Sequence, residues 1–198
     1  HFDAEITPVS FTTRKGDVTI SADEQPPKAK PEKIPTLRPA FRKDGTVTAA
    51  HSASISDGAA ALVMMKQSEA IKRGLKPIAK IVGHATHAQE PCWFTTAPID
   101  ASRKVLAKAG WTKDDVDLWE INEAFAVVAM AAMRDLELDH GKVNVHGGAC
   151  ALGHPIGATG ARLLVTLIHA LKTHGGSKGV ASLCIGGGEA TAVAVELL

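Results

Sequence analysis

A glycine-rich stretch, HGGACALGHPIGATGAR at residues 146–162, constrains the fold of this chain more than any other feature. It lies between a short run, KVNV at 142–145, and the apolar stretch LLVTLIHAL at 163–171. Glycine loses more conformational freedom on folding than other residues, so such a cluster indicates unusual backbone angles or close approaches. We therefore expect a loop of fixed shape between a strand and a buried helix at 155–173, with Pro155 in its first turn.

Strand and helix patterns alternate along the rest of the chain from residue 57 onward. Apolar runs and alternating patterns predict the following strands: 58–65, 77–86, 117–121, 142–145, 179–185 and 189–198. Amphipathic or apolar stretches predict helices at 66–74, 97–110, 122–138 and 155–173. The short GGG link at 186–188 indicates an antiparallel hairpin between the last two strands. This order predicts a layered α/β domain, a mixed sheet covered by helices.

The first 50 residues have a different character. The segment GDVTISA at 16–22 alternates as a strand does, whereas the prolines in EQPPKAKPEKIP at 24–35 exclude regular structure there. We expect a surface excursion that contains a short hairpin.

Composition excludes several classes of function. The 198 residues carry a net charge of +1 and only 4% aromatic side chains, which argues against a nucleic-acid surface. The three cysteines are an odd number and lie far apart, so a reducing compartment fits better than a disulfide framework. The longest apolar run, 124–133, is too short to span a bilayer.

Three motifs that could carry chemistry each follow a predicted strand: NEAFA at 122–126, the glycine loop at 147–162 and CIGGGEA at 184–190. Ligands of open α/β sheets gather at the carboxyl ends of strands. We therefore expect the three loops to converge on one face.

Each candidate residue also has a structural interpretation. His154 could polarise an oxyanion or deprotonate a thiol, or it could cap a helix. Cys184 could be a nucleophile or base, or an ordinary buried cysteine, and the sequence leaves both open. Asn122 could position a water or substrate, although helix capping is favoured on its motif alone. We interpret Cys150 as a packing residue.

Together the three motifs resemble the signature loops of the thiolase family. Three more segments are similar to that family: LRPAFRKDGTVTAA at 37–50, SDGAAALVM at 56–64 and PIDASRKVLAKAGW at 98–111. The resemblance implies an α/β fold with a layered α-β-α architecture, a mixed five-stranded sheet and part of a loop domain. It also implies three regions: the end of the coenzyme A-covering loop domain at 1–55, a strand and helix of an otherwise missing N-terminal core domain at 56–76, and the C-terminal core domain at 77–198.

The resemblance implies an acyltransferase that performs a reversible Claisen condensation of two acetyl-CoA molecules. Cys184 would be the acid/base cysteine, and His154 would activate the nucleophilic cysteine and bind the thioester oxygen. Asn122 would hold a water in the same oxyanion hole, and the Gly186 N–H would serve a second one. Four further residues would contact coenzyme A or the substrate: Phe125 in the pantetheine channel, Ser52 or Ser54 where the family's serine is replaced by Ala53, and Phe41 near the adenine.

The chain also departs from the family pattern. Nothing in it matches the motif of the nucleophilic cysteine, and its first residues resemble the interior of the loop domain. We expect the chain alone to be inactive and to belong to a longer cytoplasmic homodimer or homotetramer of fatty acid metabolism. We expect no metal, no cofactor besides coenzyme A thioesters as substrates, and no membrane or nucleic-acid partner. Two alternatives remain: a 3-ketoacyl-CoA thiolase of β-oxidation, and a non-catalytic thiolase-like binding protein.

Overall fold

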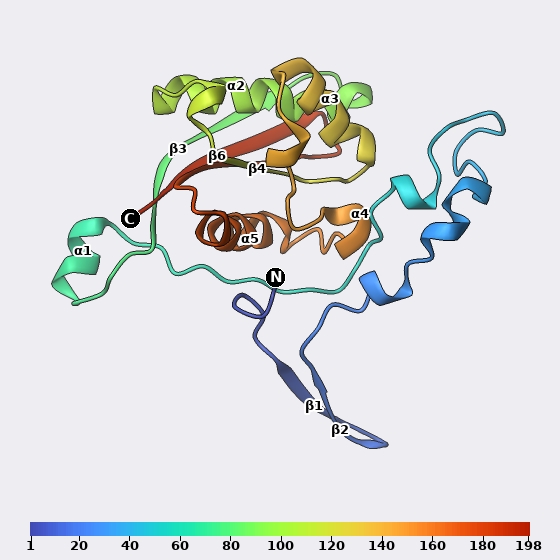
Figure 1. Ribbon diagram of the computed structural model, residues 1–198, viewed down its shortest axis with the longest axis horizontal. Helices are drawn as coiled ribbons and strands as arrows, with labels where there is room; N and C mark the ends of the chain where they lie inside the picture. The colour runs from blue at the N-terminus through green and yellow to red at the C-terminus, as the bar shows by residue number, and fades with distance from the viewer.

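A four-stranded mixed sheet organises the second half of the chain in the computed structural model, which describes residues 1–198 (Figure 1). The strand order is β3-β6-β5-β4. The strands are β3 (Ala79–Ala88), β4 (Leu118–Ile121), β5 (Lys178–Cys184) and β6 (Glu189–Leu197). β4 and β5 run parallel, whereas β6 is antiparallel to both β5 and β3. The expected hairpin at the end of the chain and the mixed character of the sheet are confirmed.

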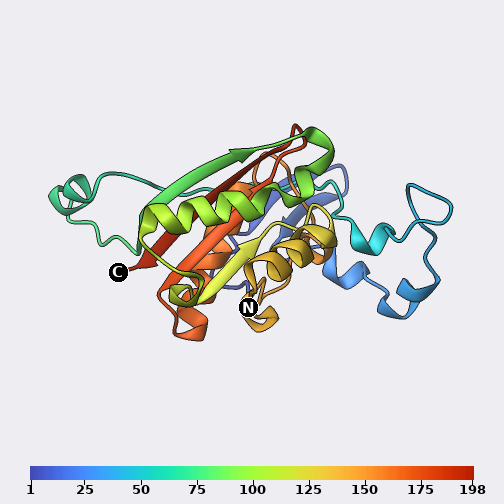
Figure 2. The same cartoon turned by 90° about the horizontal axis from the view of Figure 1, so that it is seen from above.

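Helices cover both faces of this sheet, so the layered α-β-α architecture is confirmed (Figure 1). One layer contains α2 (Ala97–Ala109), which packs on β3, β6 and β5, and α3 (Ala126–Leu136). Figure 2 looks onto this layer from above. The opposite face is covered by α5 (Thr159–His174). Side chains alternate along β4, so Leu118 packs in the α5 layer while Trp119 packs in the α2 and α3 layer.

The helices α2 and α5 are explained by the spacing of apolar residues and by the glycines that end them. Leu163, Leu167 and Leu171 recur every four residues on α5 and are buried against the sheet. Gly175, with φ of 70°, ends α5 in the left-handed conformation, and Gly110, with φ of 68°, ends α2 in the same way.

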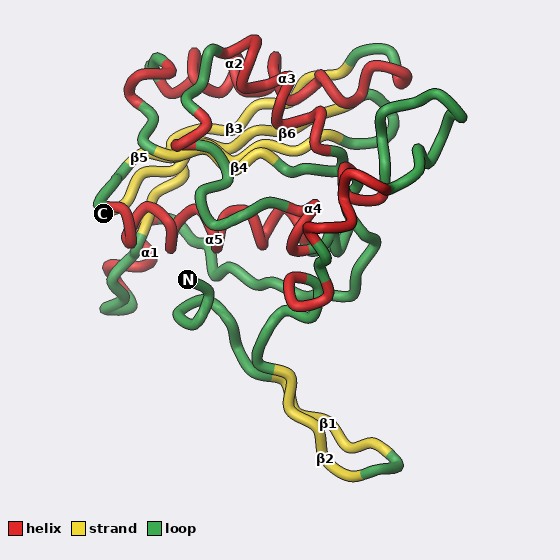
Figure 3. The backbone as a smooth tube through the Cα atoms, turned by 45° about the vertical axis from the view of Figure 1, so that its right-hand side comes forward, coloured by secondary structure: helices red, strands yellow, loops and turns green.

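The remaining elements are short. The strands β1 (Val9–Thr13) and β2 (Gly16–Ile20) form the expected antiparallel hairpin, which projects from the body of the molecule (Figures 1 and 3). The short α-helices are α1 (Gln67–Lys72) and α4 (Ala149–Leu152). The 3-10 helices are Pro26–Lys28, Pro31–Thr36, Ala49–His51, Pro91–Thr96, Lys113–Asp115 and His140–Lys142.

The strand predicted at 58–65 is absent. This segment belongs to no sheet, and its apolar side chains are largely exposed, with Val63 88% and Met64 66% accessible. An apolar run becomes a strand only when neighbouring strands pair with it, and the sheet offers this segment none. The helix expected after it is confirmed as α1.

The fifth strand, predicted at 142–145, is reduced to one bridge between Val143 and Trp119. Asn144 adopts a left-handed φ of 49°, which ends extended pairing. The Asn144 side chain takes the place of the backbone hydrogen bonds that a strand would make. Its Oδ1 accepts from the Ile121 N–H at 2.8 Å, and its Nδ2 donates to the Ile121 carbonyl at 2.9 Å. The sheet therefore has four strands and not five.

Two helices start later than the sequence predicts. α3 begins at Ala126, because Phe125 is extended and Ala124 accepts a hydrogen bond from the Ala53 N–H at 3.1 Å. α5 begins at Thr159, so Pro155 lies before the helix and not in its first turn. Both delays leave irregular backbone at the carboxyl end of the sheet, where the candidate residues lie.

Candidate active site

Asn122 and His154 bring two of the three motifs into contact. Asn122 directly follows β4, is fully buried, and donates its backbone N–H to the Ser182 carbonyl on β5 at 2.9 Å. Its side-chain Nδ2 lies 3.3 Å from His154 Nε2. The His154 backbone N–H donates to the Ser54 carbonyl at 2.9 Å. The site thus combines a strand end, the glycine loop and the segment around residue 54.

The surroundings of His154 favour a neutral imidazole. Burial lowers the pKa of His154 below its usual value of 6.5, and the nearby positive charge of Arg162 lowers it further. A neutral imidazole can take a proton from a thiol and, once protonated, donate to a developing oxyanion. The helix-capping alternative is wrong for both residues, because α3 begins four residues after Asn122 and the N-cap of α5 is Ala158 without a side-chain hydrogen bond.

Cys184 lies at the same edge of the sheet. β4 and β5 are parallel with Ile121 opposite Ser182, so Cys184 and Asn122 both lie at the carboxyl ends of adjacent strands. Cys184 is 6% exposed, and burial raises its pKa to about 11. Its sulfur is therefore a thiol at neutral pH, able to give a proton rather than attack a carbonyl.

Gly186 lies in the turn between β5 and β6. Two hydrogen bonds close this turn: Ile185 N–H to the Glu189 carbonyl at 2.7 Å and Gly188 N–H to the Ile185 carbonyl at 3.1 Å. The Gly186 N–H donates to no backbone carbonyl, and the space where a Cβ would stand is open. Gly186 is thus an exposed residue with an unpaired backbone N–H, two positions after Cys184.

The residues expected to contact coenzyme A or substrate form a neighbouring cluster. Phe41 and Phe125 meet edge to face with ring centroids 5.9 Å apart, and Ser52 pairs with Phe125 through a backbone bridge. The Ser52 hydroxyl donates to the Thr48 carbonyl at 3.0 Å. Ser54 joins the cluster through its carbonyl, which holds His154. The predicted residues are therefore brought together, although their contacts with a substrate stay predictions.

Sequence reasoning missed the group that fixes the glycine loop. The Glu123 carboxylate accepts from Asn144 Nδ2 at 2.9 Å and from the Cys150 N–H at 3.1 Å. A Cβ on Gly148 would overlap this carboxylate, so a larger residue there would displace Glu123 from these hydrogen bonds. Burial and the Glu123 charge raise the pKa of Cys150 to about 12, so it is unsuited to be a nucleophile. The only sign of this role in the sequence was that Glu123, an acidic residue, directly follows Asn122 in a chain that also contains a glycine cluster.

Other kinds of site have little support. No group of three or more His, Cys, Asp or Glu side chains lies close enough together to hold a metal ion. None of the helices is both long enough and apolar enough to cross a membrane.

Comparison with known proteins identifies the family to which this chain belongs. The family model described as thiolase, C-terminal domain, matches residues 75–197, and the model of the thiolase N-terminal domain matches residues 1–68. The chain belongs to the thiolase family. Its resemblance to that family, carried by the three loops, is confirmed.

Three known proteins are similar to this chain over nearly all of its length. The cytosolic acetyl-CoA acetyltransferase of Mus musculus is 50% identical over 199 residues, which are 99% of this chain and 50% of the relative. The crystal structure of the Bacillus anthracis acetyl-CoA acetyltransferase superposes with a TM-score of 0.96 at 47% identity, over 100% of this chain and 50% of that one. The structure of Acat5 thiolase from Ascaris suum in complex with coenzyme A gives a TM-score of 0.84 at 42% identity, over 100% of this chain and 50% of that one.

The chain spans about half the length of the curated relatives that it matches.

Proposed function

We propose that this chain supplies the acid/base and oxyanion-binding half of an acetyl-CoA acetyltransferase, within a thiolase about twice its length. The observation that carries the proposal is the contact of Asn122 with His154 beside the end of β5, where Cys184 lies. The acetyl-CoA acetyltransferases named among the relatives support the choice of reaction.

In the proposed reaction an acyl group passes from coenzyme A to a cysteine that this chain does not supply. His154 Nε2 takes the proton of that thiol, so the thiolate attacks the thioester carbonyl and coenzyme A leaves as a thiolate. The protonated imidazole and a water held by Asn122 stabilise the oxyanion. In the second step an acetyl-CoA loses an α-proton, and its carbanion attacks the acyl-enzyme carbonyl to form the new carbon–carbon bond and expel the cysteine thiolate.

Cys184 exchanges the α-proton in this scheme. Its raised pKa favours the thiol, which is the form that protonates the carbanion when acetoacetyl-CoA is cleaved. In the condensation direction Cys184 first gives its proton to the departing coenzyme A thiolate, and the resulting Cys184 thiolate takes the α-proton of acetyl-CoA. The expelled cysteine thiolate takes its proton back from His154. The Gly186 N–H would hold the enolate oxygen of the thioester, because a carbanion next to a carbonyl is stabilised only if that oxygen meets preorganised donors.

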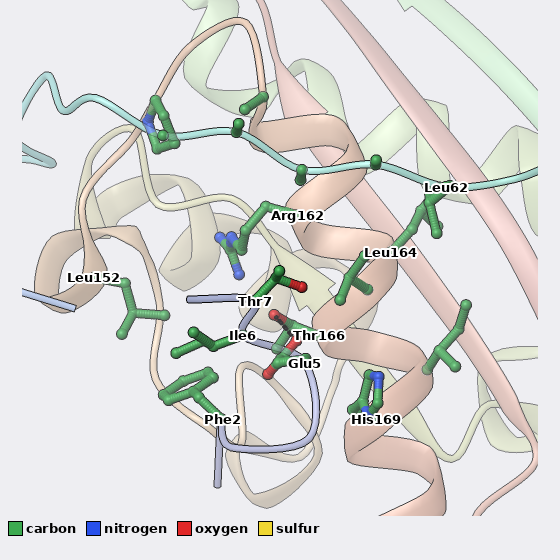
Figure 4. Close-up of a pocket in the computed structure, with 18 of the residues that line it drawn as sticks. Phe2, Glu5, Ile6, Thr7, Leu62, Leu152, Arg162, Leu164, Thr166 and His169 are labelled. Atoms are coloured by element: carbon green, nitrogen blue, oxygen red, sulfur yellow. Dashed lines mark hydrogen bonds between the residues drawn. The ribbon is translucent and has the colours of Figure 1, made fainter. Parts of the chain in front are cut away.

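We propose the same division of the chain as its sequence suggests: 1–55 in the loop domain, 56–76 in the N-terminal core domain and 77–198 in the C-terminal core domain. A cavity of about 980 Å³ supports it, since this cavity lies between the N-terminal segment, the unpaired residues 56–64 and α5 (Figure 4). Its lining is mostly apolar. The N-terminal core domain of the longer enzyme would fill this space and pair with 58–65.

Coenzyme A thioesters are the proposed substrates, and the reaction needs no resident cofactor. The coenzyme A complex of the Ascaris relative and the Phe41, Ser52 and Phe125 cluster support this choice. We also propose a cytoplasmic homodimer or homotetramer, for which the cytosolic mouse relative supports the location.

A chimera tests the proposal. The N-terminal half of the Bacillus anthracis acetyl-CoA acetyltransferase, joined to this chain, is expected to cleave acetoacetyl-CoA with coenzyme A, whereas the purified 198-residue chain is expected to show no turnover. In the chimera, His154→Ala or Cys184→Ala is expected to lower kcat by about 10²- to 10⁴-fold, the usual contribution of an acid or base.

Cys92→Ala is the matched control, because Cys92 is exposed and lies outside the site. A folded chimera without turnover would contradict the proposed reaction. Robust turnover by the chain alone would contradict the assignment of the nucleophile to another part of the enzyme.

A further inference from the structure

Thr159, the first residue of α5, lies directly behind His154. It is fully buried, and its Oγ1 lies 2.6 Å from His154 Nδ1 and 3.0 Å from the Pro155 carbonyl oxygen. His154 Nε2 lies on the other side of the ring, 3.3 Å from Asn122 Nδ2. The imidazole is therefore held at both nitrogens by neutral side chains, and the direction of these hydrogen bonds decides which nitrogen carries the proton.

Two arrangements of protons are possible in this row of side chains. In the first, Asn122 Nδ2 donates to Nε2, His154 Nδ1–H donates to Thr159, and Thr159 donates to the Pro155 carbonyl. In the second, the Asn122 amide is turned over and accepts from Nε2–H, while Thr159 donates to Nδ1. The first arrangement forms three hydrogen bonds and the second forms only two, because the threonine hydroxyl has a single proton.

The buried amide of Asn122 favours the same arrangement. One atom of this amide has no partner within the chain, and in the observed orientation it is Oδ1. In the second arrangement the unpartnered atom would be the NH₂ group, which has two donors to satisfy. The first arrangement leaves Oδ1 and one N–H of this amide without a partner, whereas the second leaves both N–H groups without one. Buried N–H groups without a partner are rarer than carbonyl oxygens without one.

We propose that Thr159 is a positioning residue that holds His154 in the Nδ1-protonated form, so that the Nε2 lone pair faces Asn122 and the bound substrate. Its relevance to acyl transfer rests on the proposed function, in which Nε2 is the atom that takes the thiol proton. The proton assignment itself depends only on the geometry of this chain. A proton on Nδ1 leaves Nε2 unprotonated, as a hydrogen-bond acceptor, without any rotation of the ring.

One charged group affects the imidazole of His154 electrostatically, the guanidinium of Arg162 on α5, and its hydrogen-bonding neighbours are the neutral Asn122 and Thr159. A positive charge nearby opposes a second proton on the ring, so the neutral form persists at neutral pH. Burial of the ring acts in the same direction. Because the ring is neutral, the remaining question is which of its two nitrogens carries the single proton. Thr159 is the side chain that hydrogen-bonds Nδ1.

Nitrogen-15 NMR of the histidine side chains in the 198-residue chain tests the proposal. At pH 8, where the ring is neutral, His154 is expected to show a protonated Nδ1 and an unprotonated Nε2. His154→Gln identifies the resonances by their loss. Thr159→Val is expected to lower the ratio of the Nδ1-protonated to the Nε2-protonated form by about 2- to 12-fold, the range of one hydrogen bond. Thr159→Ser, which keeps the hydroxyl, is expected to preserve it.

Thr166→Val is the matched control, because Thr166 is another buried threonine of α5 whose hydroxyl bonds Glu5 at 3.0 Å, away from His154. It should leave the His154 signals unchanged. The proposal is overturned if wild-type His154 carries its proton on Nε2, or if Thr159→Val leaves the ratio unchanged in a folded chain.

If Thr159→Val does not fold, the wild-type and Thr159→Ser spectra still decide, since both must show a protonated Nδ1. These spectra do not depend on turnover. A chimera that lacks activity would overturn the proposed reaction and leave the proton assignment standing. A protonated Nε2 together with an active chimera would overturn the assignment and leave the acyl transfer standing.

Discussion

Glu120 carries a buried carboxyl group on β4, and its substitution should change how the stability of the chain depends on pH. It is 1% exposed, and its nearest charged partner is Arg162, with Nη1 3.4 Å from Oε2. The other carboxyl oxygen, Oε1, has no partner within the chain. Burial raises the pKa of Glu120 from 4.5 to about 8, although Arg162 acts in the opposite direction.

The sign of the effect follows from the proton balance. Between pH 4.5 and about 8 the folded chain keeps the Glu120 proton, whereas the unfolded chain has lost it. The free energy of unfolding therefore falls as pH rises through this window. One unit of pKa corresponds to about 1.4 kcal/mol, so the full shift corresponds to about 5 kcal/mol. That is a large fraction of the stability of a typical domain, about 5–15 kcal/mol.

Glu120→Gln keeps the size of the side chain and removes its titration. Urea unfolding of both proteins at several pH values between 5 and 8.5 should show the variant gaining on the wild type by about 4 kcal/mol as pH rises. Other titrating groups are common to both proteins, so the difference isolates Glu120. Glu32→Gln, at an exposed position, is the control and should give no such trend. A pH-independent difference between wild type and Glu120→Gln would refute the reasoning.

Three further predictions concern packing, backbone and cysteine reactivity. Leu167→Ala should lower the free energy of unfolding by about 2–5 kcal/mol, because the Leu167 side chain is fully buried between α5 and the sheet. Val63 is 88% exposed, so Val63→Ala should change that free energy by less than about 0.5 kcal/mol. Urea unfolding measures both. Gly188→Ala should lower it by about 1–3 kcal/mol or more, since φ is 99° and the new Cβ would overlap a neighbouring backbone carbonyl; an unchanged unfolding midpoint would contradict the placement of this turn. A maleimide at pH 7 should label the exposed Cys92 rapidly and Cys184 slowly or not at all, because burial raises the pKa of the latter to about 11; equal rates by mass spectrometry would argue against the buried site.

The irregular parts of the fold show where local sequence stops being sufficient. The 58–65 run has the composition of a buried strand, yet it is unpaired, because pairing depends on strands that lie elsewhere in space. KVNV at 142–145 has a strand pattern, yet Asn144 pairs with Ile121 through its side chain and ends the strand. Neither outcome can be read from a window of a few residues.

The residues of the candidate site also differ in whether the local sequence predicts them. His154, Cys184, Asn122 and Gly186 were predicted as site residues because they lie in long motifs that resemble those of the thiolase family. Thr159 was not, since a threonine near a helix start is common and only its 2.6 Å contact with His154 Nδ1 distinguishes it.

The sequence by itself indicated the family, through motifs that resemble those of thiolases, and predicted β3, β4, β5 and β6 and the helices α2, α3 and α5, because apolar periodicity is a local property of the chain. The tertiary structure alone decided the strand order β3-β6-β5-β4, the number of strands and the partners of each site residue. These depend on contacts between segments far apart in the chain, such as Asn122 with His154 and Glu120 with Arg162. Burial at those contacts sets the pKa values, so the protonation of the site follows from packing and not from residue identity.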